Sequence, residues 1–196
     1  NSAHGFAGSP TQVGNLLLVA GIRGQSRGFA TYDVSDPTNP QLLDLMSPSH
    51  PDWGDREDPA YEYAMWNHFL VLPNVLNGRD FGIVDFNAPT DLKHVSFVRF
   101  TSAENVGALR YAQFQDNNMF VGYGKFDMSP LLQTPAADPK RLANHQKPDG
   151  SRLHDGEYML PVGNLIISAE NTEQSGNRSA KMVVFAHQDA PDTNTP

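Results

Sequence analysis

The chain repeats one short pattern at a spacing near fifty residues, and this repeat constrains its fold more than any other feature. The first copy covers residues 28–42, GFATYDVSDPTNPQL, in which an alternating, strand-like segment ends at a cluster of turn residues. Aspartate and asparagine side chains bond the local backbone in such turns, and the two prolines fix φ and remove an N–H donor. Apolar residues resume over 41–45. The pattern predicts two strands joined by a rigid turn.

A shift of 52 residues lays a second copy, residues 80–98, onto the first. The repeated turn residues are Asp33 with Asp85 and Pro37 with Pro89, and a shorter third copy keeps Asp127. Catalysis needs one asymmetric site, whereas every repeat needs its turn. We therefore predict a structural role for these residues, in which the aspartates accept hydrogen bonds from backbone N–H groups of the following turn.

Four asparagines, each followed by an apolar run, mark the same period along the whole chain. They are Asn15, Asn67, Asn118 and Asn164, at steps of 52, 51 and 46 residues. A short strand-like piece precedes each of them. A period near fifty residues with three or four short strands is typical of a β-propeller blade, a small antiparallel sheet that stacks against its neighbours around an axis.

We therefore predict an all-β chain that forms a β-propeller segment of about four blades, as part of a larger propeller. The blades are expected at 1–46, 60–100, 108–128 and 154–190, with an elongated polar hairpin loop at 171–179. Residues 129–153 are expected to form an insertion loop with one helical turn at 138–145. The chain ends before an outer strand of the fourth blade. We therefore expect either a longer polypeptide or, over 188–196, a linker to a further domain.

One repeat also carries a resemblance to a known family. Residues 32–40, YDVSDPTNP, resemble the consensus of LVIVD-repeat proteins, and residues 82–89 are a looser copy. The last repeat, 182–191, keeps the apolar strand and the proline but has Ala186 in place of the aspartate. The resemblance is strong over 28–42 and weak over the rest of the chain. It implies a β-propeller, typically in a secreted or surface-exposed bacterial protein, and hence an extracellular, cell-surface or periplasmic location.

Composition excludes several classes of partner. The formal net charge of the 196 residues is −8, which argues against nucleic acid and against an anionic membrane surface, since both need clustered Lys and Arg. The longest apolar run, 16–20, is too short to span a bilayer, so no direct membrane insertion is expected. There is no cysteine, and therefore no disulfide or thiolate metal site.

Two histidines are candidate metal ligands. His4 and His154 precede the two Val-Gly-Asn sequences at matching distances, and each is followed closely by a glycine. If both begin inner strands, they face the axial channel of a propeller, where imidazoles from several blades could bind copper or zinc. The alternative is that both histidines cap turns or bond loop carbonyls.

A cluster of acidic residues is a candidate calcium site. Asp52, Asp55, Glu57 and Asp58 lie within one loop, and calcium favours several carboxylate and carbonyl oxygens from a flexible loop. Their spacing does not match the EF-hand loop, so a solvated acidic loop is the alternative reading.

The sequence contains no motif of a nucleophilic enzyme, a zinc protease or a nucleotide-binding loop. The function predicted first is therefore a non-enzymatic, exported interaction or structural scaffold module, with a protein or surface partner or with self-assembly. The alternative is a propeller oxidoreductase with an axial histidine-bound metal. Calcium is the cofactor compatible with the scaffold, and copper or zinc is the cofactor that the oxidoreductase requires.

Overall fold

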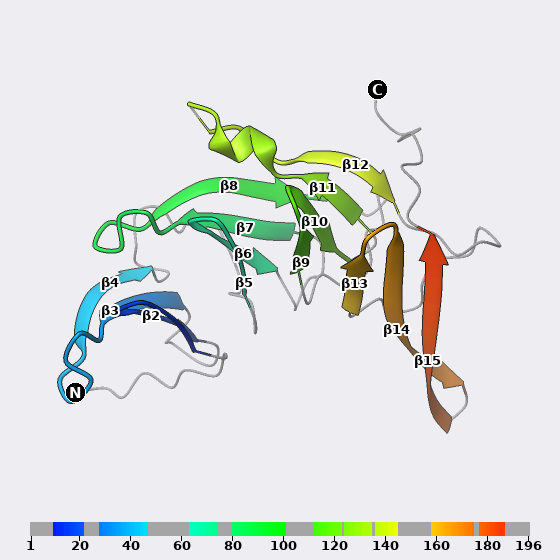
Figure 1. Ribbon diagram of the computed structural model, residues 1–196, viewed down its shortest axis with the longest axis horizontal. Helices are drawn as coiled ribbons and strands as arrows, with labels where there is room; N and C mark the ends of the chain where they lie inside the picture. Colours follow the sequence, from blue (N-terminus) through cyan, green and yellow to red (C-terminus); the bar gives the residue numbers. More distant parts are fainter. Residues whose placement is uncertain are drawn as a thin grey trace.

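The computed structural model describes residues 10–21, 28–46, 63–73, 80–100, 112–122, 124–134, 136–144, 158–174 and 177–186 of the chain. These residues form four antiparallel β-sheets and one short 3-10 helix, η1 (Ser129–Leu132) (Figure 1). The predicted all-β class is confirmed.

The strands follow one another in each sheet in sequence order, as in a meander. Sheet 1 consists of β1 (Thr11–Val13), β2 (Leu16–Gly21), β3 (Gly28–Asp33) and β4 (Gln41–Met46). Sheet 2 consists of β5 (Ala64–Trp66), β6 (Phe69–Pro73), β7 (Asp80–Asp85) and β8 (Lys93–Arg99). Sheet 3 consists of β9 (Ala112–Gln115), β10 (Asn118–Val121), β11 (Gly124–Asp127) and β12 (Lys140–Asn144). Sheet 4 has three described strands, β13 (Tyr158–Val162), β14 (Leu165–Gln174) and β15 (Asn177–Ala186).

The same two-residue turn joins the first two strands of every sheet. Its first residue has a positive φ in each case, at Gly14 (59°), Asn67 (53°), Asp116 (53°) and Gly163 (61°). Glycine, asparagine and aspartate are the residues that adopt this left-handed conformation most readily. The repeat seen in the sequence therefore corresponds to a repeated backbone turn.

The four asparagines that mark the repeat in the sequence are not structurally equivalent. The second position of the two-residue turn is filled by Asn15, His68, Asn117 and Asn164. Asn67 instead occupies the first turn position, and Asn118 is the first residue of β10. The register predicted from the asparagines is thus shifted by one residue at these two places, because the backbone selects for a positive φ and not for asparagine as such.

Two local predictions differ from the structure. Residues 138–145 were expected to contain a helical turn, but Lys140–Asn144 forms β12, which pairs with β11 and extends sheet 3 into the predicted insertion loop. Pairing to an otherwise open strand edge outweighs the local helix-start signal of Asp138 and Pro139. The predicted polar loop at 171–179 is largely a ladder, in which Asn171 pairs with Ala180 and Gln174 with Asn177. Backbone pairing in a two-stranded ribbon does not require apolar side chains.

The hydrophobic core lies between consecutive sheets. Leu18, Phe29 and Met46 of sheet 1 pack against Leu70 and Val84 of sheet 2. The sheets are arranged along an arc, with sheets 1 and 4 at its two ends (Figure 1). Each sheet is therefore stabilised chiefly by its neighbours.

Three phenylalanines dominate the core between sheets 2 and 3. The ring of Phe126 from β11 lies edge-on to Phe81 at 5.3 Å and is tilted against Phe100 at 5.7 Å. Phe81 and Phe126 are almost completely buried. Aromatic pairs of this geometry add to the free energy gained by burial.

We expect Phe126→Ala to lower the free energy of unfolding by about 3–5 kcal/mol, because it removes a buried ring and leaves a cavity between two sheets. Leu132→Ala is the control, since Leu132 on η1 is 50% exposed and its truncation should change stability by about 0.5 kcal/mol or less. Urea unfolding followed by intrinsic fluorescence measures both. Equal effects of the two substitutions would contradict this account of the core.

Candidate functional site

The residues predicted to hold a metal lie outside the described part of the chain. This applies to His4 and His154, and to the acidic loop with Asp52, Asp55, Glu57 and Asp58. Within the described residues, no group of three or more histidines, aspartates or glutamates is placed to hold a metal ion. The described residues instead present structural turns, polar contacts between sheets, and one exposed apolar face.

The repeated aspartates bond the backbone of the turn that follows them. The carboxylate Oδ1 of Asp33 accepts from the Ser35 N–H at 2.8 Å, and that of Asp85 accepts from the Asn87 N–H at 2.8 Å. Asp127 accepts from the Ser129 N–H at 2.9 Å. These are the hydrogen bonds that a structural role in the turn requires, and that role stays a prediction.

A second hydrogen bond ties each aspartate turn to the two-residue turn beside it. The backbone N–H of the residue after each aspartate donates to the backbone carbonyl of the second residue of the two-residue turn. The three pairs are Val34 with Asn15 (2.8 Å), Phe86 with His68 (2.9 Å) and Met128 with Asn117 (2.8 Å). The two turns at this end of sheets 1, 2 and 3 are therefore held together in the same way.

Hydrogen bonding also lowers the pKa of two carboxyl groups in the turn of sheet 1. The pKa of Asp33 lies below its ordinary value of 3.8, first because the Ser35 backbone N–H donates to its carboxylate and then because the Ser35 side chain does. The pKa of Asp36 is lowered as well, because the Thr38 hydroxyl and backbone N–H donate to it at 2.7 Å and 3.0 Å. In both cases the charged form is favoured by donors and not by a neighbouring cation.

The repeated prolines occupy equivalent turns, and one of them takes part in a contact between sheets. Pro37 follows Asp36, and Pro89 holds the same place in the turn of sheet 2. The hydroxyl of Thr31, which is fully buried in sheet 1, donates to the Pro89 carbonyl at 2.6 Å. The turn of sheet 2 is thus fastened to the middle of β3.

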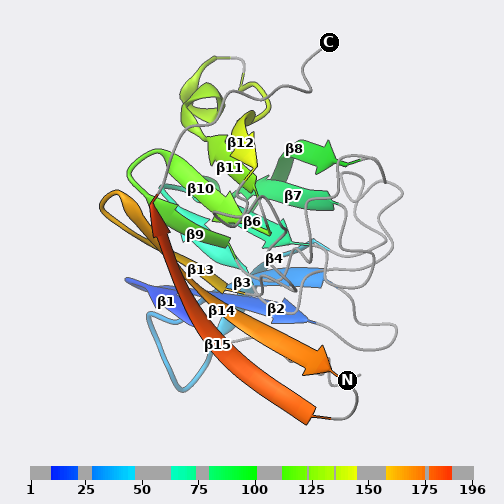
Figure 2. The ribbon, with the colours of Figure 1, turned by 90° about the vertical axis from the view of Figure 1, so that its right-hand side faces the viewer.

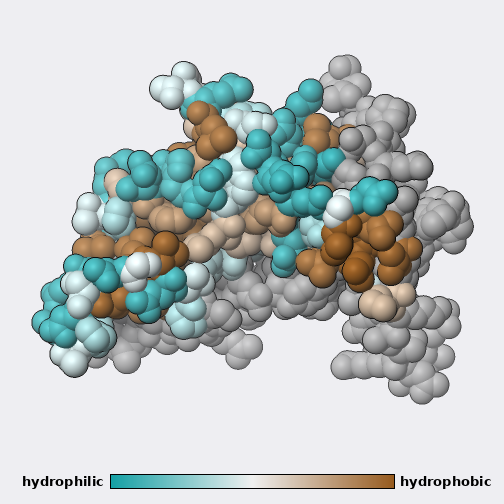
Figure 3. Space-filling view, in the orientation of Figure 1, coloured by the Kyte–Doolittle hydropathy of each residue, from teal (hydrophilic) through white to brown (hydrophobic). Residues whose placement is uncertain are grey.

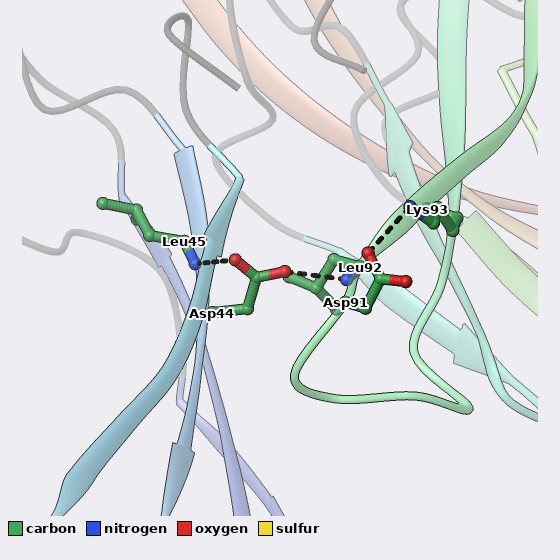
Figure 4. A network of polar contacts seen from close by, with 5 residues as sticks. All are labelled: Asp44, Leu45, Asp91, Leu92 and Lys93. Carbon is green, nitrogen blue, oxygen red and sulfur yellow. Dashed lines mark hydrogen bonds and ion pairs between the residues drawn. The ribbon is translucent and has the colours of Figure 1, made fainter. Parts of the chain in front are cut away.

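Asp44 makes a second polar link between sheets 1 and 2 (Figure 4). Its carboxylate accepts from the Leu45 N–H on its own strand and from the Leu92 N–H of sheet 2, both at 2.7 Å. Leu92 is fully buried, and its N–H precedes β8. Beside this link, Asp91 and Lys93 form an ion pair at 2.7 Å whose side chains are 63% and 54% exposed.

Polar links at equivalent positions continue along the stack. Ser96 lies opposite Ile83 as Asp44 lies opposite Thr31, and its hydroxyl donates to the Asp138 carboxylate of sheet 3 at 2.7 Å. Two side chains that immediately precede a two-residue turn donate to the turn of the next sheet. These bonds run from Trp66 Nε1 to the Asp116 carbonyl (2.9 Å) and from Gln115 Nε2 to the Gly163 carbonyl (3.0 Å).

These contacts give every sheet a direction. We call the face toward the next sheet in the chain the forward face and the opposite one the rear face. The ladder pair Leu16–Asp33 lies on the forward face of sheet 1, and the pair Phe69–Asp85 occupies the same place in sheet 2. In sheet 4 the corresponding pair is Leu165–Ala186. The register therefore identifies its forward face.

The rear face of sheet 4 is buried. Met159, Ile166 and Ser168 lie on this face and are between 0% and 2% exposed. They are on the side where β13 lies against β9 and β10 of sheet 3. Sheet 4 thus packs onto sheet 3 in the same sense as the earlier sheets pack onto one another.

The forward face of sheet 4 is apolar and exposed. Leu160, Ile167 and Val184 form one row across its three strands, and Val162 and Leu165 form the next. The exposed fractions are 49% for Leu160, 51% for Val162, 40% for Leu165, 76% for Met182 and 52% for Val184. Sheet 4 lies at the near side of the molecule in Figure 2. In Figure 3, apolar atoms gather where Figure 1 shows sheet 4. This face is the candidate interaction surface.

Sequence reasoning missed this surface although the signal is present. Residues 158–169 and 182–186 are apolar at most positions, so both faces of these strands carry apolar side chains. This pattern is typical of a strand that is covered on both sides. Only the pairing register of the strands shows which of the two faces is covered by sheet 3 and which is exposed.

Comparison with known proteins adds little. No family model matches the sequence, and no curated protein matches it. Among solved structures the chain is similar to Kluyveromyces lactis Hsv2, with 11% sequence identity and a TM-score of 0.38 over 90% of this chain. The chain spans 48% of the length of that structure. A likeness at this TM-score carries no argument about fold or function.

The described residues form no helix with the length and hydrophobicity that crossing a bilayer requires.

We expect Asp44→Ala to lower the free energy of unfolding by about 1–3 kcal/mol, because it leaves the buried Leu92 N–H without its acceptor. Asp91→Ala is the matched control: it removes an aspartate next to the same strand, but from an exposed ion pair that contributes about 0–1 kcal/mol. Chemical unfolding of both variants tests the difference. If Asp44→Ala costs no more than Asp91→Ala, the inter-sheet link has no energetic role.

The lowered pKa values of Asp33 and Asp36 predict an acid-sensitive contribution to stability. A carboxylate whose pKa is lower in the folded chain stabilises it above the ordinary pKa of 3.8, and this contribution is lost as the pH falls through the folded value. The double variant Asp33→Asn, Asp36→Asn should therefore lose less stability than the wild type as the pH is lowered below 3.8. Thermal unfolding across that range gives both profiles, and superimposable profiles would contradict the prediction.

Proposed function

We propose that this chain is a segment of a β-propeller of the LVIVD-repeat type, in which sheets 1 to 4 are successive blades. Three observations support the proposal. The sheets are meanders of similar size, they pack forward face to rear face in sequence order, and sheets 1 and 2 repeat the same aspartate–proline turn. The described sheets follow an open arc and do not close a ring (Figure 1).

We further propose that the segment is a non-enzymatic interaction or structural scaffold module of an exported protein. The observation that carries this proposal is the exposed apolar forward face of sheet 4, because contiguous apolar surface on a folded protein usually marks a site of association. The expected partner is a protein or surface, or another copy of the chain. The exported location is what the LVIVD resemblance implies.

The polar groups of the repeats are consistent with a scaffold. The carboxylates of Asp33, Asp85 and Asp127 accept hydrogen bonds from backbone N–H groups within their own turns. Asp44 and Asp138 accept hydrogen bonds from the neighbouring sheet. Each of these side chains is engaged in holding strands or sheets together, which is a structural use of a carboxylate.

Element-resolved metal analysis of the intact protein tests the proposal against an oxidoreductase with an axial metal. The scaffold requires no stoichiometric copper, zinc or iron, and the double variant His4→Ala, His154→Ala should keep the unfolding temperature of the wild type. Bound calcium that survives both substitutions would agree with the scaffold. A stoichiometric transition metal that is lost in the double variant would overturn the proposal.

A further inference from the structure

We draw no further inference here: the strongest candidate, the apolar forward face of sheet 4 with the exposed side chains of Leu160, Val162 and Val184, carries none, because nothing in the structure shows what covers it.

Discussion

The whole structure depends on covering the apolar faces of its small sheets. A sheet of three or four short strands with apolar side chains on both faces is not stable alone in water, because at least one face would remain hydrated. Here the forward face of one sheet covers the rear face of the next. The buried rings of Phe81 and Phe126 lie at one such junction and the buried Leu18 and Leu70 at another. Stacking is therefore the means by which this chain forms a core.

Hydrophobic packing is not directional, and the polar links supply the direction. Asp44 reaches the Leu92 N–H, and Ser96 reaches Asp138 from the equivalent position one sheet later. Bonds of this kind fix how far one sheet is rotated and shifted against the next, since each buried donor must find its acceptor. The turns at the ends of the sheets serve the same purpose within a sheet, through Asp33, Asp85 and Asp127.

Much of this local structure could be predicted from the sequence because it depends on local chemistry. The aspartate turns were predictable, since Asp33 and Ser35 are neighbours and the bond between them needs no tertiary context. The strand β12 was not, because its formation depends on the free edge of β11, and the residues around Asp138 carry a local signal for a helix. The alignment of the repeats on their asparagines was wrong by one residue at two places for a related reason. The turn requires a positive φ at its first residue, and Gly14, Asn67 and Asp116 meet this requirement with different side chains. The exposed face of sheet 4 could be recognised only from the ladder register.

The central claim is that each sheet of this chain is held in place by its contacts with the neighbouring sheets. The most direct test is a double-mutant cycle on the Ser96 hydroxyl of sheet 2 and the Asp138 carboxylate that accepts from it. Ser96→Ala, Asp138→Ala and the double variant are compared with the wild type by chemical unfolding. The account predicts an interaction free energy of about 0.5–3 kcal/mol between the two substitutions, because they remove the same hydrogen bond. Additive losses of stability would contradict it.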